Sequence, residues 1–347
     1  MLSYFADEAI EEIERRIKAY KRAYRPIFVL CDTHTYEHCL PLLQEYVSSD
    51  FVKNTLTIPA GEENKNIQTA ITLWQTLLDK NANRNAVLIC LGGGVVCDIG
   101  GFVGATFKRG IEYMLIPTSL IAQIDACIGG KNAVNLDGIK NQVGLFRQPD
   151  TVFTIPKFLN TLPEKEILSG FAEMLKHGLV ADKTYWEKLA TISAVSQITQ
   201  YELIKKSILI KTSICNVDFY DMGERQKLNF GHTIGHALES HAMAVGRPYT
   251  HGEAVAIGMM VEADISFQKK LISEDELASI TSVLRRFFSP VLVEKPDYTA
   301  ILFYMQKDKK KVNNSFSFTL LNKIGGAVVN QQVSVDEIRQ SIENLSN

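Results

Sequence analysis

Two histidines spaced four residues apart are the first residues in this sequence whose arrangement could support chemistry. His232 and His236 lie in the apolar stretch LNFGHTIGHALES (228–240), and His251 follows in HGEAVAIGMM, in a chain with only seven histidines. Positions i and i+4 share one face of a helix, so both side chains can point into the same space. One buried histidine is more often a hydrogen-bonded core residue than a ligand, whereas these three, two of them on one helical face, favour a metal site.

A carboxylate could complete such a site, because a catalytic zinc ion commonly takes three ligands from His and Asp/Glu and keeps a fourth position open. Glu173, in GFAEMLKHG, is the best candidate, since an unpaired acid in an apolar helical stretch would be costly. An ion pair with Lys176 or His177 is the alternative explanation of this glutamate. Glu253 is a weaker candidate that stands beside His251 and could instead orient a histidine.

A glycine cluster follows an apolar, β-rich run in LICLGGGVVCDIGGFVGATF (88–107). Backbone amides at the start of a helix can hold a phosphate, and a dinucleotide site needs this strand–turn–helix context. The match to GxGxxG is incomplete, because Gly92 and Gly94 fit while the third position is Cys97. The alternative is a tight turn in which the later glycines allow close helix packing; these are Gly100, Gly101 and Gly104.

Several lysines and arginines stand among glycines, amides or apolar residues rather than on a solvated helix face. Donors beside a fixed positive charge suit a phosphate or carboxylate ligand. The combination predicts an anionic, hydroxyl-bearing ligand. The segments are FKRG, GGKNAVN, IKNQVG, MLKHG, ILIKTS, GERQKLNFGH and KDKKK.

Alternating elements must position these residues in the first half of the chain. Short apolar runs at 26–32, 86–94 and 111–119 indicate strands, and the pattern at 66–81 indicates a helix between two of them. This alternation predicts parallel strands with crossover helices. From about residue 160 the periodicity is helical, apart from a small β element expected at 315–330. We therefore expect an α/β domain over 1–160 and a mainly helical domain over 161–347.

The composition excludes several classes of protein. Thirty-seven Lys plus Arg against 39 Asp plus Glu give a net charge of −2, without the basic footprint of a nucleic-acid binder. The apolar runs fall short of the roughly 20 residues that a membrane span needs. Residues 1–26 are charged and helical in period, unlike a signal peptide. The six cysteines form no CxxC pair, so we expect reduced core thiols in a cytoplasmic protein.

Six segments, in this order, resemble the 3-dehydroquinate synthase family, one of the NAD- and metal-dependent sugar-phosphate cyclases. The likeness runs from about residue 26 to 330. It implies a Rossmann-like α/β domain and a helical domain. It also implies a homodimer, because members of this family are usually dimers. The implied reaction converts 3-deoxy-D-arabino-heptulosonate 7-phosphate to 3-dehydroquinate and phosphate with transient reduction of NAD, a step of aromatic amino acid biosynthesis. The segments are GGGVVCDIGGFVGATFKRG, IPTSLIAQIDACIGGKNAVN, IKNQVGLFRQP, GFAEMLKHG, LNFGHTIGHALE and HGEAVAIGM.

The resemblance also implies roles for individual residues. Zinc or cobalt would be held by Glu173, His232 and His251. Substrate contacts would come from Asp125, Lys131, Asn141, Lys176, Lys211, Arg225, Asn229 and His236, with Arg109 and Lys140 at the phosphate and one or both of Lys309 and Lys310 from the C-terminal segment. The cofactor site would comprise Asp32, Glu62, Lys65, Gly93, Gly94, Val95, Asp98, Thr118, Ser119, Lys131, Lys140 and Thr161.

The sequence departs from the family at its beginning, where we expect no β segment before the first helix. Cys97 also replaces a common glycine. Three alternatives stay open. Relatives that make 2-deoxy-scyllo-inosose or epi-valiolone products are less favoured because Lys211 and Asn229 resemble the dehydroquinate branch. A metal-dependent polyol dehydrogenase would leave net NADH, and both Glu173 and the phosphate-directed cations argue against it. A regulator that has lost catalysis is the third alternative, and the full set of cations argues against it.

Overall fold

The computed structural model describes residues 2–47, 53–136, 139–246, 249–288, 298–308 and 315–346. The chain divides into two compact units, residues 1–163 and 164–347. Each unit has its own layers and its own buried residues, and each is described separately.

A six-stranded sheet forms the centre of the first unit, in the order β1-β8-β5-β4-β2-β3. All of its neighbouring strands are parallel. The strands predicted at 26–32, 86–94 and 111–119 are therefore confirmed as parallel strands of one sheet. The strands are β1 (Leu2–Phe5), β2 (Ile27–Asp32), β3 (Thr55–Ile58), β4 (Val87–Gly92), β5 (Glu112–Pro117) and β8 (Thr151–Thr154).

The edge strand β1 corrects an expectation from the sequence. Leu2–Phe5 pairs in parallel with Thr151–Thr154, and the rings of Tyr4 and Phe153 stack with centroids 5.8 Å apart. The prediction that no β segment precedes the first helix was wrong. Four residues are too few to show a period, and their hydrogen-bond partners lie about 150 positions away along the chain.

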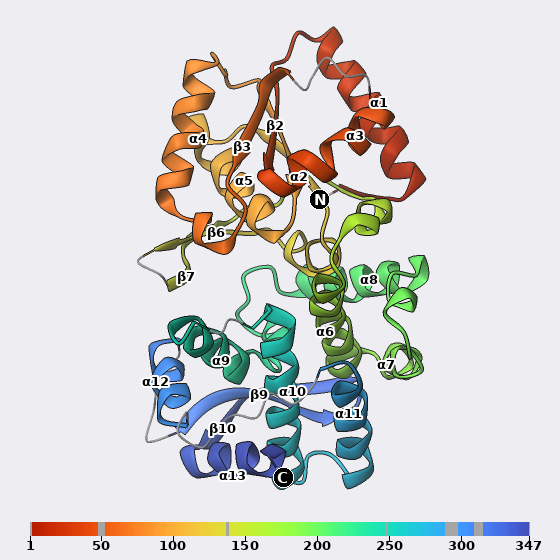
Figure 1. Ribbon diagram of the computed structural model, residues 1–347, viewed down its shortest axis with the longest axis vertical. Helices are drawn as coiled ribbons and strands as arrows, with labels where there is room; N and C mark the ends of the chain where they lie inside the picture. The colour runs from red at the N-terminus through yellow and green to blue at the C-terminus, as the bar shows by residue number, and fades with distance from the viewer. Residues whose placement is uncertain are drawn as a thin grey trace. The chain divides into compact units, whose positions relative to one another are not determined.

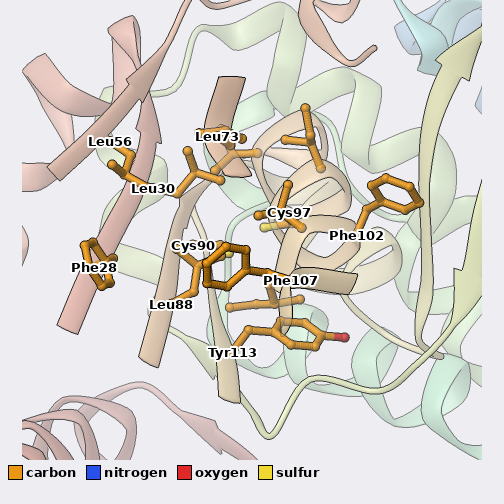
Figure 2. Packing of buried hydrophobic residues seen from close by; sticks show 14 of the residues in the cluster. Phe28, Leu30, Leu56, Leu73, Leu88, Cys90, Cys97, Phe102, Phe107 and Tyr113 are labelled. Atoms are coloured by element: carbon orange, nitrogen blue, oxygen red, sulfur yellow. The ribbon is translucent and has the colours of Figure 1, made fainter. Parts of the chain in front are cut away.

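Helices cover both faces of this sheet, with α4 and α5 on one face and α1 and α3 on the other (Figure 1). Alternate residues of β2 divide between the two layers: Phe28 and Leu30 pack with α4 and α5, and Ile27 and Val29 pack with α1 and α3. Figure 2 shows the first layer from close by. The helices are α1 (Asp7–Arg22), α2 (Thr33–His38), α3 (Leu40–Tyr46), α4 (Ile67–Asp79) and α5 (Gly94–Thr106).

Short elements complete the first unit. An antiparallel hairpin, β6 (Lys131–Leu136) and β7 (Ile139–Phe146), extends beside α5, and the sequence analysis did not predict it. Its glycines, amides and lysines indicated a ligand site rather than a strand. The remaining segments are η2 (Glu62–Asn64), η3 (Phe107–Arg109), the π turn η4 (Ala122–Ala126) and η5 (Pro156–Thr161).

The connections of the sheet leave a switch point between β2 and β4. From β2 the chain moves outward to β3, and from β4 it moves the opposite way to β5. In open α/β sheets a ligand crevice lies outside the carboxyl ends of the strands at such a point. Asp32 ends β2 and Gly92 ends β4, so the glycine turn stands where the topology places a ligand.

The second unit is mainly helical around one buried helix, α10. This helix packs against α6, α9, α11, α13 and β9, and nearly all its residues from Gly252 to Ser266 are buried. The hairpin β9–β10 confirms the β element expected at 315–330. The elements are α6 (Glu164–Ala181), α7 (Lys183–Ala190), η6 (Val195–Gln197), α8 (Tyr201–Val217), η7 (Glu224–Asn229), α9 (His232–Ala244), α10 (His251–Gln268), α11 (Glu274–Phe287), α12 (Tyr298–Asp308), β9 (Ser315–Lys323), β10 (Gly326–Ser334) and α13 (Val335–Ser346).

Two glycines bring the main chain of α10 into direct contact with the main chain of its neighbours. A Cβ atom on Gly258 would lie 1.9 Å from the carbonyl oxygen of Gly231, just before α9. A Cβ atom on Gly252 would lie 2.3 Å from Cα of Ser169 in α6, and its amide donates to the Ser169 hydroxyl at 2.8 Å. Any side chain at either position would push the helices apart. The three helices therefore meet at distances that the backbone sets.

Two expectations from the composition can be compared with the structure. In the part of the chain that it describes, no helix combines the length and the apolar character of a membrane span. All six cysteines are buried and none forms a disulfide, which confirms them as core residues.

The Gly258 contact generates a stability prediction. Gly258→Ala should lower the free energy of unfolding by at least about 3 kcal/mol, because the methyl group has no space and the neighbouring atoms belong to main chain. Gly246→Ala is the matched control: its added carbon meets nothing within 4 Å, so only its left-handed φ of 72° opposes it, at about 1 kcal/mol. Equal losses in urea denaturation would contradict the close-approach explanation.

Candidate active site

Three helices of the second unit bring one carboxylate and two imidazoles together. Glu173 lies in the middle of α6 and is 1% exposed, and His232 and His251 are the first residues of α9 and α10. The Nε2 atoms of His232 and His251 lie 3.5 and 3.4 Å from Oε1 of Glu173. One ligand atom from each residue lies within 4.8 Å of the other two. The three predicted metal-ligating side chains therefore converge on one point.

The other nitrogens of the two imidazoles face acceptors. Nδ1 of His232 is 3.2 Å from the carbonyl oxygen of Phe230, and Nδ1 of His251 is 3.6 Å from Oε2 of Glu239. A proton on each Nδ1 leaves the Nε2 lone pair free to bind a metal, and both Nε2 atoms are the ones that face Glu173. One carboxylate and two imidazoles match the protein donors of a catalytic zinc site.

The protonation of the two histidines differs because their neighbours differ. Burial and the charge of Lys176 hold the pKa of His232 well below its ordinary value, so this imidazole is neutral. Burial also opposes the charged form of His251, but the carboxylates of Glu173 and Glu239 outweigh it and raise its pKa to about 9. Nε2 of His232 is therefore already free, whereas a metal ion would have to displace the Nε2 proton of His251.

Glu173 also makes the contact that was the alternative explanation of this residue. Its Oε2 atom forms an ion pair with Nζ of Lys176, one turn further along α6, while Oε1 faces the histidines. The ion pair is observed and leaves the metal-ligand prediction possible, since Oε1 is not used by Lys176. The ion pair fixes the orientation in which Oε1 points at the imidazoles.

Glu253, expected as an orienter of His251, has another role. Its carboxylate accepts from the amide of Thr250 at 2.7 Å, and the Thr250 hydroxyl accepts in return from the Glu253 amide, so the pair caps α10. That prediction was wrong, because a residue two positions after the start of a helix points back to its cap. Glu239 faces the imidazole instead.

Two buried carboxylates near the histidines were missed. Glu239 follows His232 by seven positions, the spacing of one helical face, and this signal could have identified it. Glu262 of α10 accepts from the amides of Gly231 and Ile234 at 2.6 and 3.3 Å. These amides begin α9, so Glu262 stabilises the helix end that carries His232. No local pattern links residues 231 and 262.

Further predicted substrate contacts lie on elements that pack together in this unit. His236 lies one turn from His232, with ring centroids 5.1 Å apart, and 6.0 Å from His251. Lys176 of α6, Lys211 of α8 and Arg225 of η7 are all at most 7% exposed, and these three elements contact one another. Arg225 donates to the carbonyl of Phe219 at 2.8 Å; Asn229 ends the same segment. Buried cations at this density suit an anionic ligand.

The glycine turn of the first unit leaves its backbone open. A Cβ atom on Gly93 would meet only the Ser119 side chain, at 3.4 Å or more, and one on Gly94 would meet only Ala126, at 3.7 Å. Protein packing therefore does not require glycine at either position, and the bare amides begin α5. Gly100 is different, because its Cβ would lie 2.3 Å from Sγ of Cys90. Packing thus explains Gly100, whereas phosphate binding at Gly93 and Gly94 stays a prediction.

A buried lysine connects several predicted cofactor residues. Nζ of Lys65 lies 3.1 Å from Asp98, 3.2 Å from Glu62 and 2.8 Å from Oδ1 of Asn141. Burial alone would lower the pKa of Lys65, but Asp98 and Glu62 outweigh it and raise the pKa, so the ammonium stays charged. Burial raises the pKa of Asp98, an effect that Lys65 offsets only in part.

The remaining predicted residues fall into two groups. Some lie at the carboxyl edge of the sheet: Asp32 caps α2, Val95 lies in the first turn of α5, and Thr118 and Ser119 follow β5. Others lie on connections, namely Arg109 in η3, Asp125 in η4, Lys131 in β6, Lys140 in β7 and Thr161 in η5. Arg109 has a left-handed φ of 71°, an uncommon conformation for this residue type. Lys309 and Lys310 lie outside the described residues.

Family profiles match most of the chain. The profile for the 3-dehydroquinate synthase N-terminal region matches residues 55–169, and the profile for the C-terminal region of the same enzyme matches residues 170–311. The curated 3-dehydroquinate synthase of Parabacteroides distasonis is 38% identical over 323 residues, which cover 92% of this chain and 91% of that protein.

Solved structures of sugar-phosphate cyclases share the fold. A 2-deoxy-scyllo-inosose synthase in complex with carbaglucose-6-phosphate, NAD+ and Co2+ superposes with a TM-score of 0.85 at 25% identity, covering 99% of this chain and 96% of that one. The 2-epi-5-epi-valiolone synthase of Streptomyces hygroscopicus, with NAD+ and Zn2+ bound, gives a TM-score of 0.78 at 26% identity, over 93% of this chain and 91% of that one.

The convergence on Glu173 generates a metal-binding prediction. Glu173→Gln should weaken zinc or cobalt binding by more than about 100-fold, because it removes the anionic ligand and leaves the charge of Lys176 beside the site. Titration calorimetry on metal-free protein measures this. Glu253→Gln is the matched control and should bind metal like the unaltered protein. Equal affinities of the two variants would overturn the assignment of Glu173.

The contact between Glu239 and His251 leads to a second prediction, of a smaller loss of metal affinity. Glu239→Gln keeps the size of the side chain but removes the charge that favours a proton on Nδ1, so we expect metal affinity to fall about 10- to 100-fold. Competition with a chelator gives the affinity, and a melting curve shows whether the fold is retained. An affinity within about threefold of the unaltered protein, in a folded variant, would remove Glu239 from the site.

Proposed function

The chain belongs to the 3-dehydroquinate synthase family, and we propose that it converts 3-deoxy-D-arabino-heptulosonate 7-phosphate to 3-dehydroquinate and phosphate. The observation that carries this proposal is the approach of two imidazole Nε2 atoms to one buried carboxylate oxygen, beside buried cations. A polyol dehydrogenase needs a metal but has no use for so many cations. A phosphorylated, carboxylate-bearing substrate accounts for both features.

We propose that Glu173, His232 and His251 hold a divalent ion, zinc or cobalt. The donor types and the Nδ1 contacts described above fit such an ion, and the two related cyclases contain Co2+ and Zn2+. A bound divalent ion supplies Lewis acidity, which lowers the pKa of a hydroxyl group that it contacts. Lys176 holds the carboxylate in place for this task through its ion pair with Glu173.

We propose that the first unit binds NAD, which would accept a hydride and return it within one turnover. The open amides at Gly93 and Gly94 would hold the pyrophosphate at the start of α5. Asp32 ends the neighbouring strand, where an acidic residue would bind ribose hydroxyls. Both related cyclases have NAD+ bound. In this assignment residues 1–160 form the NAD-binding domain, which also contributes substrate contacts, and residues 161–347 form the metal- and substrate-binding domain.

Fixed positive charges would bind the two anionic ends of the substrate: Lys211 and Arg225 are buried, whereas Lys140 is partly exposed and Arg109 is exposed. Lys211, Arg225 and Asn229 suit the carboxylate, and Arg109 and Lys140 suit the phosphate, which leaves as an anion and is stabilised by fixed positive charge. Asp125, Lys131, Asn141 and His236 would bind hydroxyl groups, with one or both of Lys309 and Lys310. The protein chiefly holds reacting groups in place and excludes water, which favours ring closure within one molecule. We also propose a cytoplasmic homodimer.

A coupled assay tests the function. Metal-loaded protein, NAD and the heptulosonate phosphate should release phosphate with no lasting nicotinamide absorbance, because the hydride returns to the substrate. Accumulating NADH would identify a dehydrogenase instead. Glucose 6-phosphate serves as the comparison, since its carba analogue occupies the related inosose synthase. A preference for glucose 6-phosphate would move the chain to that branch of the cyclases.

A further inference from the structure

The final residue of GGKNAVN, Asn135, has no part in the proposed chemistry, yet its contacts are specific. Its backbone amide donates to the carbonyl oxygen of Lys65 at 2.7 Å, and it forms an isolated parallel bridge with Asn66. These two contacts attach strand β6 to the segment that leads into α4. The backbone of Asn135 is therefore fixed relative to Lys65 and Glu62.

The side chain of Asn135 bridges two residues that were predicted as ligand contacts. Its Nδ2 donates to Oε1 of Glu62 at 2.9 Å, and its Oδ1 accepts from the backbone amide of Asn141 at 2.9 Å. One end of the amide thus contacts the cofactor side of the network, and the other end contacts the β7 strand of the hairpin. Only an amide supplies a donor and an acceptor at this separation on one short side chain.

Asn141 needs such support because its backbone is in an uncommon conformation. Its φ is 56°, in the left-handed region, which residues other than glycine adopt uncommonly and Asn adopts more often than most. Two contacts retain it: the amide bond to Asn135 and the bond from Nζ of Lys65 to Oδ1 at 2.8 Å. Together they fix both the backbone and the side chain of Asn141.

We propose that Asn135 is a positioning residue that holds Asn141 in the conformation in which its side chain meets the substrate. The inference rests on the proposed function, because that function gives Asn141 its substrate contact. Asn135 itself touches neither substrate nor cofactor. It acts through the Asn141 amide, and its bond to Glu62 keeps its own side chain oriented.

A double-mutant cycle tests whether Asn135 acts through Asn141. Asn135→Ala should lower kcat/KM for the heptulosonate phosphate about tenfold, the usual worth of one such hydrogen bond. In the Asn141→Ala background the same change should lower kcat/KM less than about twofold, because the side chain that it positions is gone. A full tenfold loss in both backgrounds would overturn the proposal. Leu136→Ala, at the exposed neighbour in β6, is the matched control and should retain full activity.

Hydrogen exchange tests the contact without any activity. The Asn141 amide should exchange about tenfold faster in Asn135→Ala than in the unaltered protein, and at the unaltered rate in the control Leu136→Ala. Unchanged exchange in folded Asn135→Ala would refute the positioning role. If the unaltered protein releases no phosphate, the proposed function fails and the substrate role of Asn141 fails with it, while the exchange result still decides the contact.

Discussion

A carboxylate buried among helices is the constraint on which the second unit depends. Glu173 is almost fully removed from water, and an isolated charge there would be very costly. Lys176 faces one of its oxygens and two imidazoles face the other, so its neighbourhood is already arranged for positive charge. These contacts require α9 and α10 to begin, and α6 to pass, at one point. The small residues of α9 and α10 permit this approach, and the buried carboxylate of Glu262 secures the first turn of α9.

In the first unit, too, charged groups are balanced by neighbours of opposite sign. Its sheet ends in bare amides at the switch point, where they favour an anion, while Glu62 and Asp98 bring negative charge close to the same edge. Lys65 lies between these carboxylates and extends the network to the β6–β7 hairpin through Asn141. Through this network, Asn141 of the hairpin is connected to Asp98 of α5, the helix that begins at the glycine turn. The helix, the hairpin and the segment before α4 are thus held together by one set of charge-assisted contacts.

Local patterns predicted the elements that carry their own periodicity. The buried strands at 26–32 and 86–94, the helix at 66–81 and the mainly helical second half all have enough residues to show a period. Features that depend on distant partners were not predictable in this way. Strand β1 exists because of Thr151–Thr154, Glu262 is explained only by the amides of Gly231 and Ile234, and Asn135 only by Glu62 and Asn141. Glu253 was misjudged because nearness to His251 in the sequence does not say where its side chain points. The seven-residue spacing from His232 to Glu239 does, since it places both side chains on one face of the helix.

The contact of Gly258 with Gly231 limits how the two imidazole-bearing helices can move. Main-chain atoms have no rotamers, so turning a side chain cannot change the separation of α9 and α10 at this contact. Pushing the two packed backbones apart would meet the low compressibility of the interior. The main chain therefore fixes the points from which His232 and His251 reach toward Glu173, and only the two imidazole side chains can still rotate.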